Sequence, residues 1–156
     1  MLINSNEYID LVNEIKRQIQ LAQYRAALEV NTELVMLYHH IGSEINRHKV
    51  WGNKFIDSLS ADLRIDFPGV KGYSVRNLKY MAKFASLFSD EEIVQPIVAQ
   101  ITWSHHIVLM NKTKNPEEYR WYAAATAKNG WSRNVLVHQI ESGLYERQVL
   151  VDKVSN

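Results

Sequence analysis

Cysteine is absent from this 156-residue chain, which excludes a disulfide framework and a thiolate metal site. Long apolar runs are absent too, because no stretch approaches the roughly 20 residues that a membrane-spanning helix needs. The first residues, MLINSNEYIDLVNEIK, carry acids early and lack the apolar centre of a secretion signal. We therefore expect a cytoplasmic protein that does not enter a membrane.

Glycine and proline are scarce, with six and three residues, and they interrupt the chain at only a few points. Between these points the sequence shows helical periodicity and good helix-forming residues, which predicts a mainly α fold. One stretch, 93-IVQPIVAQI-101, is rich in β-branched residues, so a short strand or wing is an open alternative there. Pro96 argues against a central strand, because proline has no backbone N–H to donate.

Catalytic motifs are also missing from the sequence. It contains no glycine-rich phosphate loop, no G-x-S-x-G and no His-x-Glu with a cysteine pair. Asp10 with 14-EIK-16 resembles the acid and acid-x-lysine spacing of a metal-dependent nuclease, but that motif belongs on a strand and this segment is strongly helical. We expect no catalytic centre, no metal site and no cofactor in this chain, and so no enzyme activity of its own.

Histidine occurs in two adjacent pairs, His39-His40 and His105-His106. Neighbouring residues in a helix point about 100° apart, so neither pair can bind one ion from one face. His40 and Glu44 have a four-residue spacing that suits a metal, but the sequence offers them no third ligand. Histidines with hydrogen-bond partners inside packing interfaces are the simpler interpretation.

An apolar stripe along the first third of the chain predicts a long helical segment. The mean spacing of its apolar residues is slightly longer than the 3.6 residues of one helical turn, so the stripe drifts around the helix axis. The segment therefore either breaks into two helices near residues 21–25 or bends around a partner, and that partner is either a second chain or a folded-back part of this one. The stripe consists of Leu11, Ile15, Ile19, Ala22, Ala26, Val30, Leu34, Leu37, Ile41 and Ile45.

Positive charge is concentrated in one segment, although the whole chain carries only +1. From Arg47 to Lys83 there are eight lysines or arginines and three acids, so this segment carries +5 and the rest of the chain −4. Such a concentration suits a phosphate-binding surface. A solvated surface without a ligand is the plainer alternative, and charge alone does not decide between them.

Two predicted helices lie on either side of a turn in this basic segment. The first, 54-KFIDSLSADLRIDF-67, has apolar residues at four-residue spacing, and the second, 74–88, has an apolar side opposite a basic side. This is the outline of a helix-turn-helix, although the turn at about 68–73 is longer than usual. Arginine can form two hydrogen bonds with guanine, and asparagine can form two with adenine. Lysine can contact backbone phosphates. The predicted DNA-contacting residues are Lys71, Arg76, Asn77, Lys79, Tyr80 and Lys83.

Three later helices are predicted to begin at an aromatic residue followed by serine: Tyr73-Ser74, Trp103-Ser104 and Trp131-Ser132. Serine at a helix start accepts a hydrogen bond from a free backbone N–H, and the aromatic residue before it pins the entering chain. The last of these helices is predicted to run over 132–147. Its outer face is mixed in charge, which favours packing and partner contacts over phosphate binding.

Four ordered blocks make the chain resemble the N-terminal domain of the YhcG family of predicted nucleases. They are 20-QLAQYRAALEVNTELVMLYHHIG-42, 66-DFPGVKGYSVRNLKYMAKF-84, 101-ITWSHHIVLM-110 and 129-NGWSRNVLVHQIESGLYERQ-148. The resemblance implies an α-rich domain with a winged-helix or helix-turn-helix element. It also implies a C-terminal PD-(D/E)XK nuclease domain beyond this domain, and some family members accompany restriction-modification systems. We expect that catalytic half to be absent here and transfer no catalytic residue.

Two functions follow from these observations. The first is a DNA-binding module that targets a nuclease to duplex DNA, and the alternative is a module that forms a homodimer or docks the nuclease domain without touching DNA. The expected organisation is an N-terminal helical segment over 1–50 for packing or dimerisation, a helix-turn-helix-like domain over 51–148 and a tail over 149–156 that leads to the nuclease domain.

Overall fold

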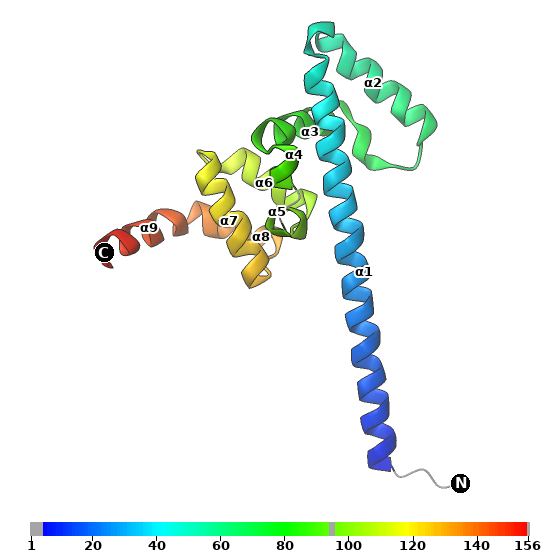
Figure 1. Ribbon diagram of the computed structural model, residues 1–156, viewed down its shortest axis with the longest axis vertical. Helices are drawn as coiled ribbons and strands as arrows, with labels where there is room; N and C mark the ends of the chain where they lie inside the picture. The colour runs from blue at the N-terminus through cyan, green and yellow to red at the C-terminus, as the bar shows by residue number, and fades with distance from the viewer. Residues whose placement is uncertain (1–4, 94–95, 156) are drawn as a thin grey trace.

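A computed structural model describes residues 5–93 and 96–155, and the regular elements of this part of the chain are all helices, with no strand (Figure 1). The mainly α prediction is confirmed. Short 3-10 turns occupy Lys49–Trp51 and Lys71–Tyr73. The helices within the described ranges are α1 Ser5–Arg47, α2 Asn53–Asp66, α3 Val75–Leu87, α4 Asp90–Ile93, α5 Pro96–Gln100, α6 Trp103–Lys112, α7 Pro116–Asn129, α8 Arg133–Glu141 and α9 Leu144–Ser155.

Helix α1 runs unbroken from Ser5 to Arg47, so of the two alternatives for this segment the break near residues 21–25 is wrong. The residues there, LAQYR, include neither glycine nor proline, and a drifting apolar stripe alone does not end a helix. The N-terminal half of α1 projects beyond the other helices, while its C-terminal half lies against them (Figure 1). The long helix therefore has one packed half and one projecting half.

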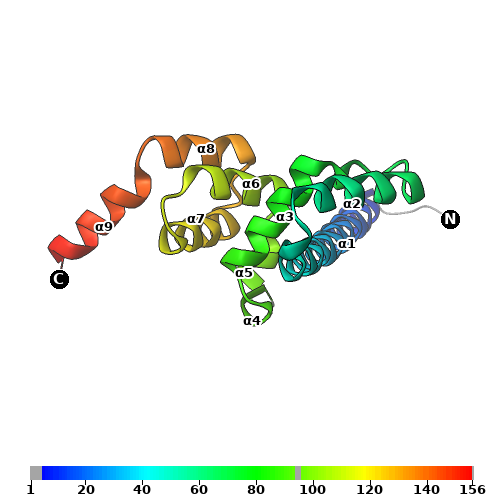
Figure 2. The same cartoon turned by 90° about the horizontal axis from the view of Figure 1, so that it is seen from above.

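Helices α1 and α3 cross in close contact, and Gly42 makes that contact possible. A Cβ atom added to Gly42 would lie 1.9 Å from the carbonyl oxygen of Met81, which is too close for any side chain. Tyr38, Ile45, Leu78 and Met81 are buried around this crossing. Leu78 and Met81 belong to the apolar side predicted for 74–88, and α3 lies in the middle of the molecule when it is seen from above (Figure 2).

A second and larger core joins α3 to α5, α6, α7 and α8. Buried aromatic rings connect these helices, with Phe84 of α3 close to His106 and Phe88, the residue after α3, close to Tyr119. The buried members of this core are Val35, Phe84, Phe88, Val98, Ile101, Val108, Leu109, Met110, Tyr119, Tyr122, Ala123 and Leu136. The apolar side of α3 thus supports both cores, which fixes where its opposite side points.

The short strand or wing allowed for 93–101 is wrong over the described residues, because Pro96–Gln100 is the helix α5 and Ile93 ends α4. Side chains bond to the carbonyls that a strand partner would otherwise take. Asn31 of α1 donates its amide to the carbonyls of Ala99 and Ile101 at 3.0 and 2.9 Å. The imidazole Nε2 of His106 lies 2.7 Å from the carbonyl of Val98. Residues 94–95 of the proposed wing lie outside the described residues.

Two of the three predicted helix starts are confirmed. Ser74 accepts a hydrogen bond from the N–H of Asn77, and Ser132 accepts one from the N–H of Val135. Ser104 does not cap α6, because Thr102 stands at that position and forms a reciprocal capping box with His105. The aromatic-serine pattern therefore places this cap two residues too late in the chain.

The single helix predicted over 132–147 is also wrong, because α8 ends at Glu141 and α9 begins at Leu144. Gly143 lies between them with φ 74°, a left-handed conformation that favours glycine and ends a helix. Leu136 is buried and Ile140 and Leu144 are half-buried. Over the ranges that the structure covers, no helix combines the length and apolarity needed to cross a membrane.

Candidate nucleic-acid interface

The turn between α2 and α3 is held in place from both sides. The hydroxyl of Ser60, in α2, donates a hydrogen bond to the carbonyl of Tyr73 at 2.6 Å. Gly72 lies directly against Tyr38 of α1, and a Cβ at this position would come within 2.2 Å of the tyrosine hydroxyl oxygen. The turn therefore has one defined path over α1, and that path fixes Lys71 beside the first turn of α3.

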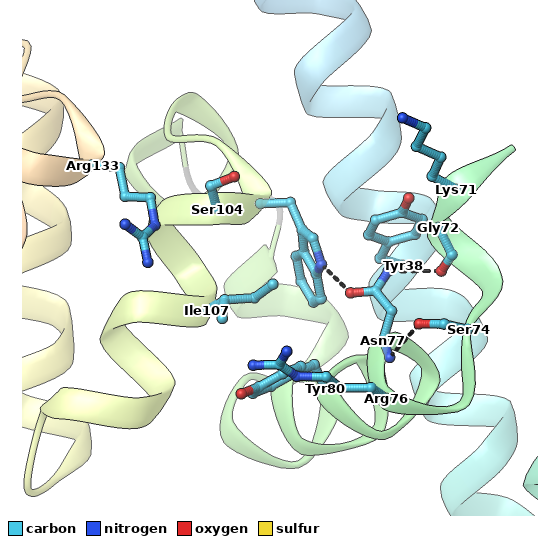
Figure 3. Close-up of a pocket in the computed structure, with 11 residues that line it drawn as sticks. Tyr38, Lys71, Gly72, Ser74, Arg76, Asn77, Tyr80, Ser104, Ile107 and Arg133 are labelled. Carbon is cyan, nitrogen blue, oxygen red and sulfur yellow. Dashed lines mark hydrogen bonds between the residues drawn. The ribbon is translucent and has the colours of Figure 1, made fainter.

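An open groove of about 480 Å³ lies between the start of α3 and helix α6 (Figure 3). Figure 3 shows Arg133, Ser104 and Ile107 along one side and Lys71, Gly72 and Arg76 along the other. Residues from five parts of the chain form its walls: α1, the turn before α3, α3 itself, α6 and the first residue of α8. Its lining residues are Tyr38, Lys71, Gly72, Ser74, Arg76, Asn77, Tyr80, Trp103, Ser104, Ile107 and Arg133.

The groove carries positive charge and no opposing carboxylate. Lys71, Arg76 and Arg133 line it, and no aspartate or glutamate does. Lys79 and Lys83 continue the positive surface along the exposed side of α3, where they share a shallow surface depression with Arg76. We call these five exposed residues, Lys71, Arg76, Lys79, Lys83 and Arg133, the groove cations.

Within residues 5–93 and 96–155, none of the groove cations forms an ion pair with a carboxylate. Five other cations do form such pairs, which shows that acids are available on this surface. They are Arg17 with Glu14, Arg47 with Glu44, Lys112 with Glu141, Lys114 with Glu146, and Arg120 with Glu92. The positive potential of the groove is therefore left without compensation from the described part of the chain.

The ring of Tyr80 contacts the guanidinium group of Arg76. The guanidinium carbon of Arg76 lies 5.6 Å from the centre of the Tyr80 ring, within the range of a cation–π contact. The Tyr80 hydroxyl in turn exchanges hydrogen bonds with the side chain of Asn111 at 2.9 and 3.2 Å. The hydrogen bond with Asn111, followed by that with Arg76, lowers the pKa of Tyr80. These contacts restrict the orientation of the Arg76 guanidinium at the rim of the groove.

Lys83 combines a surface charge with a structural contact. Its ammonium group donates a hydrogen bond to the carbonyl of Met110 at 3.0 Å. Met110 lies in the last turn of α6, where carbonyl groups lack partners inside the helix and attract positive charge. This hydrogen bond holds the lysine between α3 and α6.

Asn77, predicted as a base contact, is half-buried and uses both ends of its amide inside the protein. Its nitrogen donates to the carbonyl of Gly72 at 2.7 Å, and its oxygen accepts from the indole N–H of Trp103 at 2.8 Å (Figure 3). Asn77 thus ties the turn before α3 to the start of α6. The groove depends on this residue for its shape.

Arg133 and Ser104 are groove residues that sequence reasoning did not select. Arg133 is the first residue of α8, whose outer face was interpreted as mixed in charge, and it lies far from α3 in the sequence. No local pattern indicates that the start of α8 faces the start of α3, because this juxtaposition depends on α6 packing between them. The five remaining predicted residues and Asn77 do lie together, as expected of neighbours on one turn and one helix.

The described residues offer no cluster of three or more His, Asp or Glu that would hold a metal ion. Glu14 of the nuclease-like triplet lies on the helix α1 and is hydrogen-bonded to Arg17, which lowers the pKa of its carboxyl group. Three of the four paired histidines have hydrogen-bond partners inside the protein, as the sequence predicts. His39 bonds the carbonyl of Phe88 at 2.6 Å, His105 bonds Thr102 and the carbonyl of Trp131, and His106 lies 2.6 Å from the Tyr119 hydroxyl.

Comparison with known proteins identifies the family. The chain matches the DUF1016 N-terminal domain over residues 14–147. It is 24% identical over 179 aligned residues to the Escherichia coli K12 protein named "Putative nuclease YhcG", an alignment that covers 92% of this chain and 47% of that protein. The chain thus spans about half the length of this curated relative, and no solved structure matches it. This chain belongs to the DUF1016 N-terminal domain family.

Proposed function

We propose that this domain is a non-catalytic module that binds duplex DNA and targets a nuclease to it. The observation that carries the proposal is the groove together with the adjoining exposed side of α3, where the five groove cations gather and no acid of the described chain pairs with them. Proteins that bind DNA neutralise backbone phosphates with lysine and arginine, and this supplies most of their sequence-independent affinity. A positive groove without internal compensation is suited to that ligand.

The groove cations have different roles in this proposal. Arg76, oriented by Tyr80, and Arg133, at the opposite wall, bind phosphate oxygens through their planar guanidinium groups. Lys71, Lys79 and Lys83 contribute point charges along the path of the backbone. Asn77 positions the turn and α6 and does not read a base, because both ends of its amide already have partners.

Helices α2 and α3, with the turn between them, act in this proposal as a helix-turn-helix-like element. The start of α3 presents Arg76 and Lys79 outward, as the second helix of such an element does. The nuclease activity itself is assigned to a part of the protein beyond this domain. The E. coli relative is named a putative nuclease and the alignment covers 47% of it, which supports this division.

Fluorescence anisotropy with a labelled duplex oligonucleotide over a salt series tests the proposal. We expect binding that weakens steeply with salt, with a slope of about 0.9 per phosphate neutralised in a logarithmic plot. The variant Arg76→Glu/Lys83→Glu should lose at least about tenfold in affinity at low salt, because it replaces two attractive charges by repulsive ones.

The matched control is Lys128→Glu/Lys153→Glu, which changes the net charge by the same amount at exposed positions outside the groove. This control should retain most of the affinity of the native chain. Equal losses in the two variants would show that only total charge matters and would contradict a groove. DNA cleavage by this chain in the presence of Mg²⁺, lost on mutation of Glu14 and Lys16, would contradict the non-catalytic role.

A further inference from the structure

Helix α1 carries an apolar stripe on its projecting half that nothing in the described chain covers. Tyr8, Ile15, Ile19 and Val30 are between 49% and 68% exposed. Alanines 22 and 26 are exposed as well, and Val12 is half-buried. We call the set Tyr8, Val12, Ile15, Ile19, Ala22, Ala26 and Val30 the α1 seam. Large apolar side chains that are exposed together in this way mark an interaction surface more often than a solvated one.

The seam is distinct from the face of α1 that packs on the rest of the molecule. The packed face is formed by Val35, Tyr38, His39, Gly42 and Ile45, which are buried. At 100° per residue, the packed face points roughly 150° away from the seam. The helix therefore has two apolar faces, and the α3 contact uses only one of them.

The C-terminal half of α1 differs from the projecting half in how its apolar residues are covered. Ile41 packs against the buried cluster of Tyr38, Ile45, Leu78 and Met81. Towards the N-terminus, α1 projects alone (Figure 1). The seam residues of the projecting half therefore have no such cover within the described chain.

The spacing within the seam selects a helix as the partner. From Tyr8 to Ala26 the seam residues are separated alternately by four and three positions, which is the heptad spacing of two-stranded coiled coils. A partner of this kind presents the same spacing on its own surface. A second α1 does so by definition, and a twofold pair brings the same patch of both copies together.

We infer that α1 of one copy pairs with α1 of a second copy along this seam. Because the packed face points away from the seam, the two folded bodies lie on the outside of such a pair. Seven seam residues from each helix would bury on the order of 1,200 Å² in total, at the lower end of the range for specific interfaces. This inference is independent of the proposed DNA binding, since it uses a different surface.

Sedimentation equilibrium from about 1 to about 100 µM protein tests the pairing. We expect a concentration-dependent dimer that the variant Ile15→Glu/Ile19→Glu weakens by more than about 100-fold, because two charges per helix would enter an apolar seam. The control Asn13→Glu/Gln20→Glu adds the same charge to the opposite, exposed side of the same stretch and should leave the dimer intact. Glutamate forms helix well, so each variant retains α1.

Cysteine cross-linking provides a second readout, since the native chain contains no cysteine. Tyr8→Cys forms a disulfide-linked dimer if the helices are parallel, and a mixture of Tyr8→Cys with Ala26→Cys forms the mixed dimer if they are antiparallel. Either product supports the seam. A monomer at all concentrations, a dimer that the seam variant does not weaken, or the absence of both cross-links would overturn the inference.

Discussion

The buried interior and the groove treat polar groups in opposite ways. In the interior, His106 lies between the Tyr119 hydroxyl and the Val98 carbonyl. The side-chain amide of Asn31 donates to the carbonyl of Ala99 in α5 and to that of Ile101, which follows α5. Among the buried side-chain polar atoms of the described chain, only the Thr126 hydroxyl lacks a partner. In the groove, by contrast, Lys71, Arg76 and Arg133 are exposed and have no carboxylate partner within the described residues. Polar groups with partners in the interior hold the fold, whereas charges without a carboxylate partner are available to a ligand.

Helix α1 shows the same contrast for apolar groups. Its C-terminal half buries side chains against α3, and its N-terminal half exposes the apolar α1 seam. We expect substitutions in the interior to change stability and, under the proposed function, substitutions in the groove to change DNA binding.

The largest effect is expected at the crossing of α1 and α3. Gly42→Ala places a methyl group 1.9 Å from the carbonyl oxygen of Met81, and backbone atoms of two packed helices cannot move aside locally. We expect a loss of about 3 kcal/mol or more in the free energy of unfolding. Urea denaturation followed by circular dichroism measures it.

The matched control is Gly69→Ala in the turn between α2 and α3. A Cβ at Gly69 meets no atom within 4 Å, so alanine there should change stability by less than about 0.5 kcal/mol. Equal effects at the two glycines would show that the crossing of α1 and α3 is looser than described.

A smaller effect is expected from acid acting on the interior. Burial lowers the pKa of His106 from its ordinary 6.5 to about 4. The unfolded chain therefore binds a proton at a higher pH than the folded one, and stability decreases as the pH falls from about 6.5 to about 4. Between pH 7 and about pH 5 we expect a loss of about 2 kcal/mol from this residue, measured by urea denaturation at each pH.

His106→Gln provides the comparison for that prediction. The variant should be less stable than the native chain at pH 7, because the side chain is buried and bonded, but it should depend less on pH down to about pH 5. If His106→Gln has the same pH dependence as the native chain, other groups cause the loss of stability at low pH.

Local sequence patterns predicted the local parts of the fold well. The helices α2 and α3, the caps at Ser74 and Ser132 and the helical N-terminal segment follow from propensity, periodicity and hydroxyl side chains near their own backbone. The errors arose where tertiary contacts or competing local signals decided the outcome. Thr102 displaced the expected cap at α6, and carbonyl partners from α1 and α6 stabilise helix at residues 96–100 where a strand was an alternative.

The same division applies to the site. Lys71, Arg76, Lys79, Tyr80 and Lys83 were predictable as a group because one turn and one helix carry them. Two facts about the groove were not predictable from the sequence: that Asn77 is occupied inside the fold, and that Arg133 lies across from Arg76. Both depend on α6, which contacts α3 on one side and supports α8 on the other.

The most direct test of the account therefore uses Arg133, which only the folded groove connects to α3. The salt dependence of duplex DNA binding would be measured for the native chain, Arg133→Ala and the exposed control Lys128→Ala. We expect Arg133→Ala to weaken binding and to reduce the logarithmic salt slope by about 1, the loss of one phosphate contact, while Lys128→Ala leaves the slope unchanged. Identical slopes for the native chain and Arg133→Ala would contradict the assignment of the groove as the phosphate-binding surface.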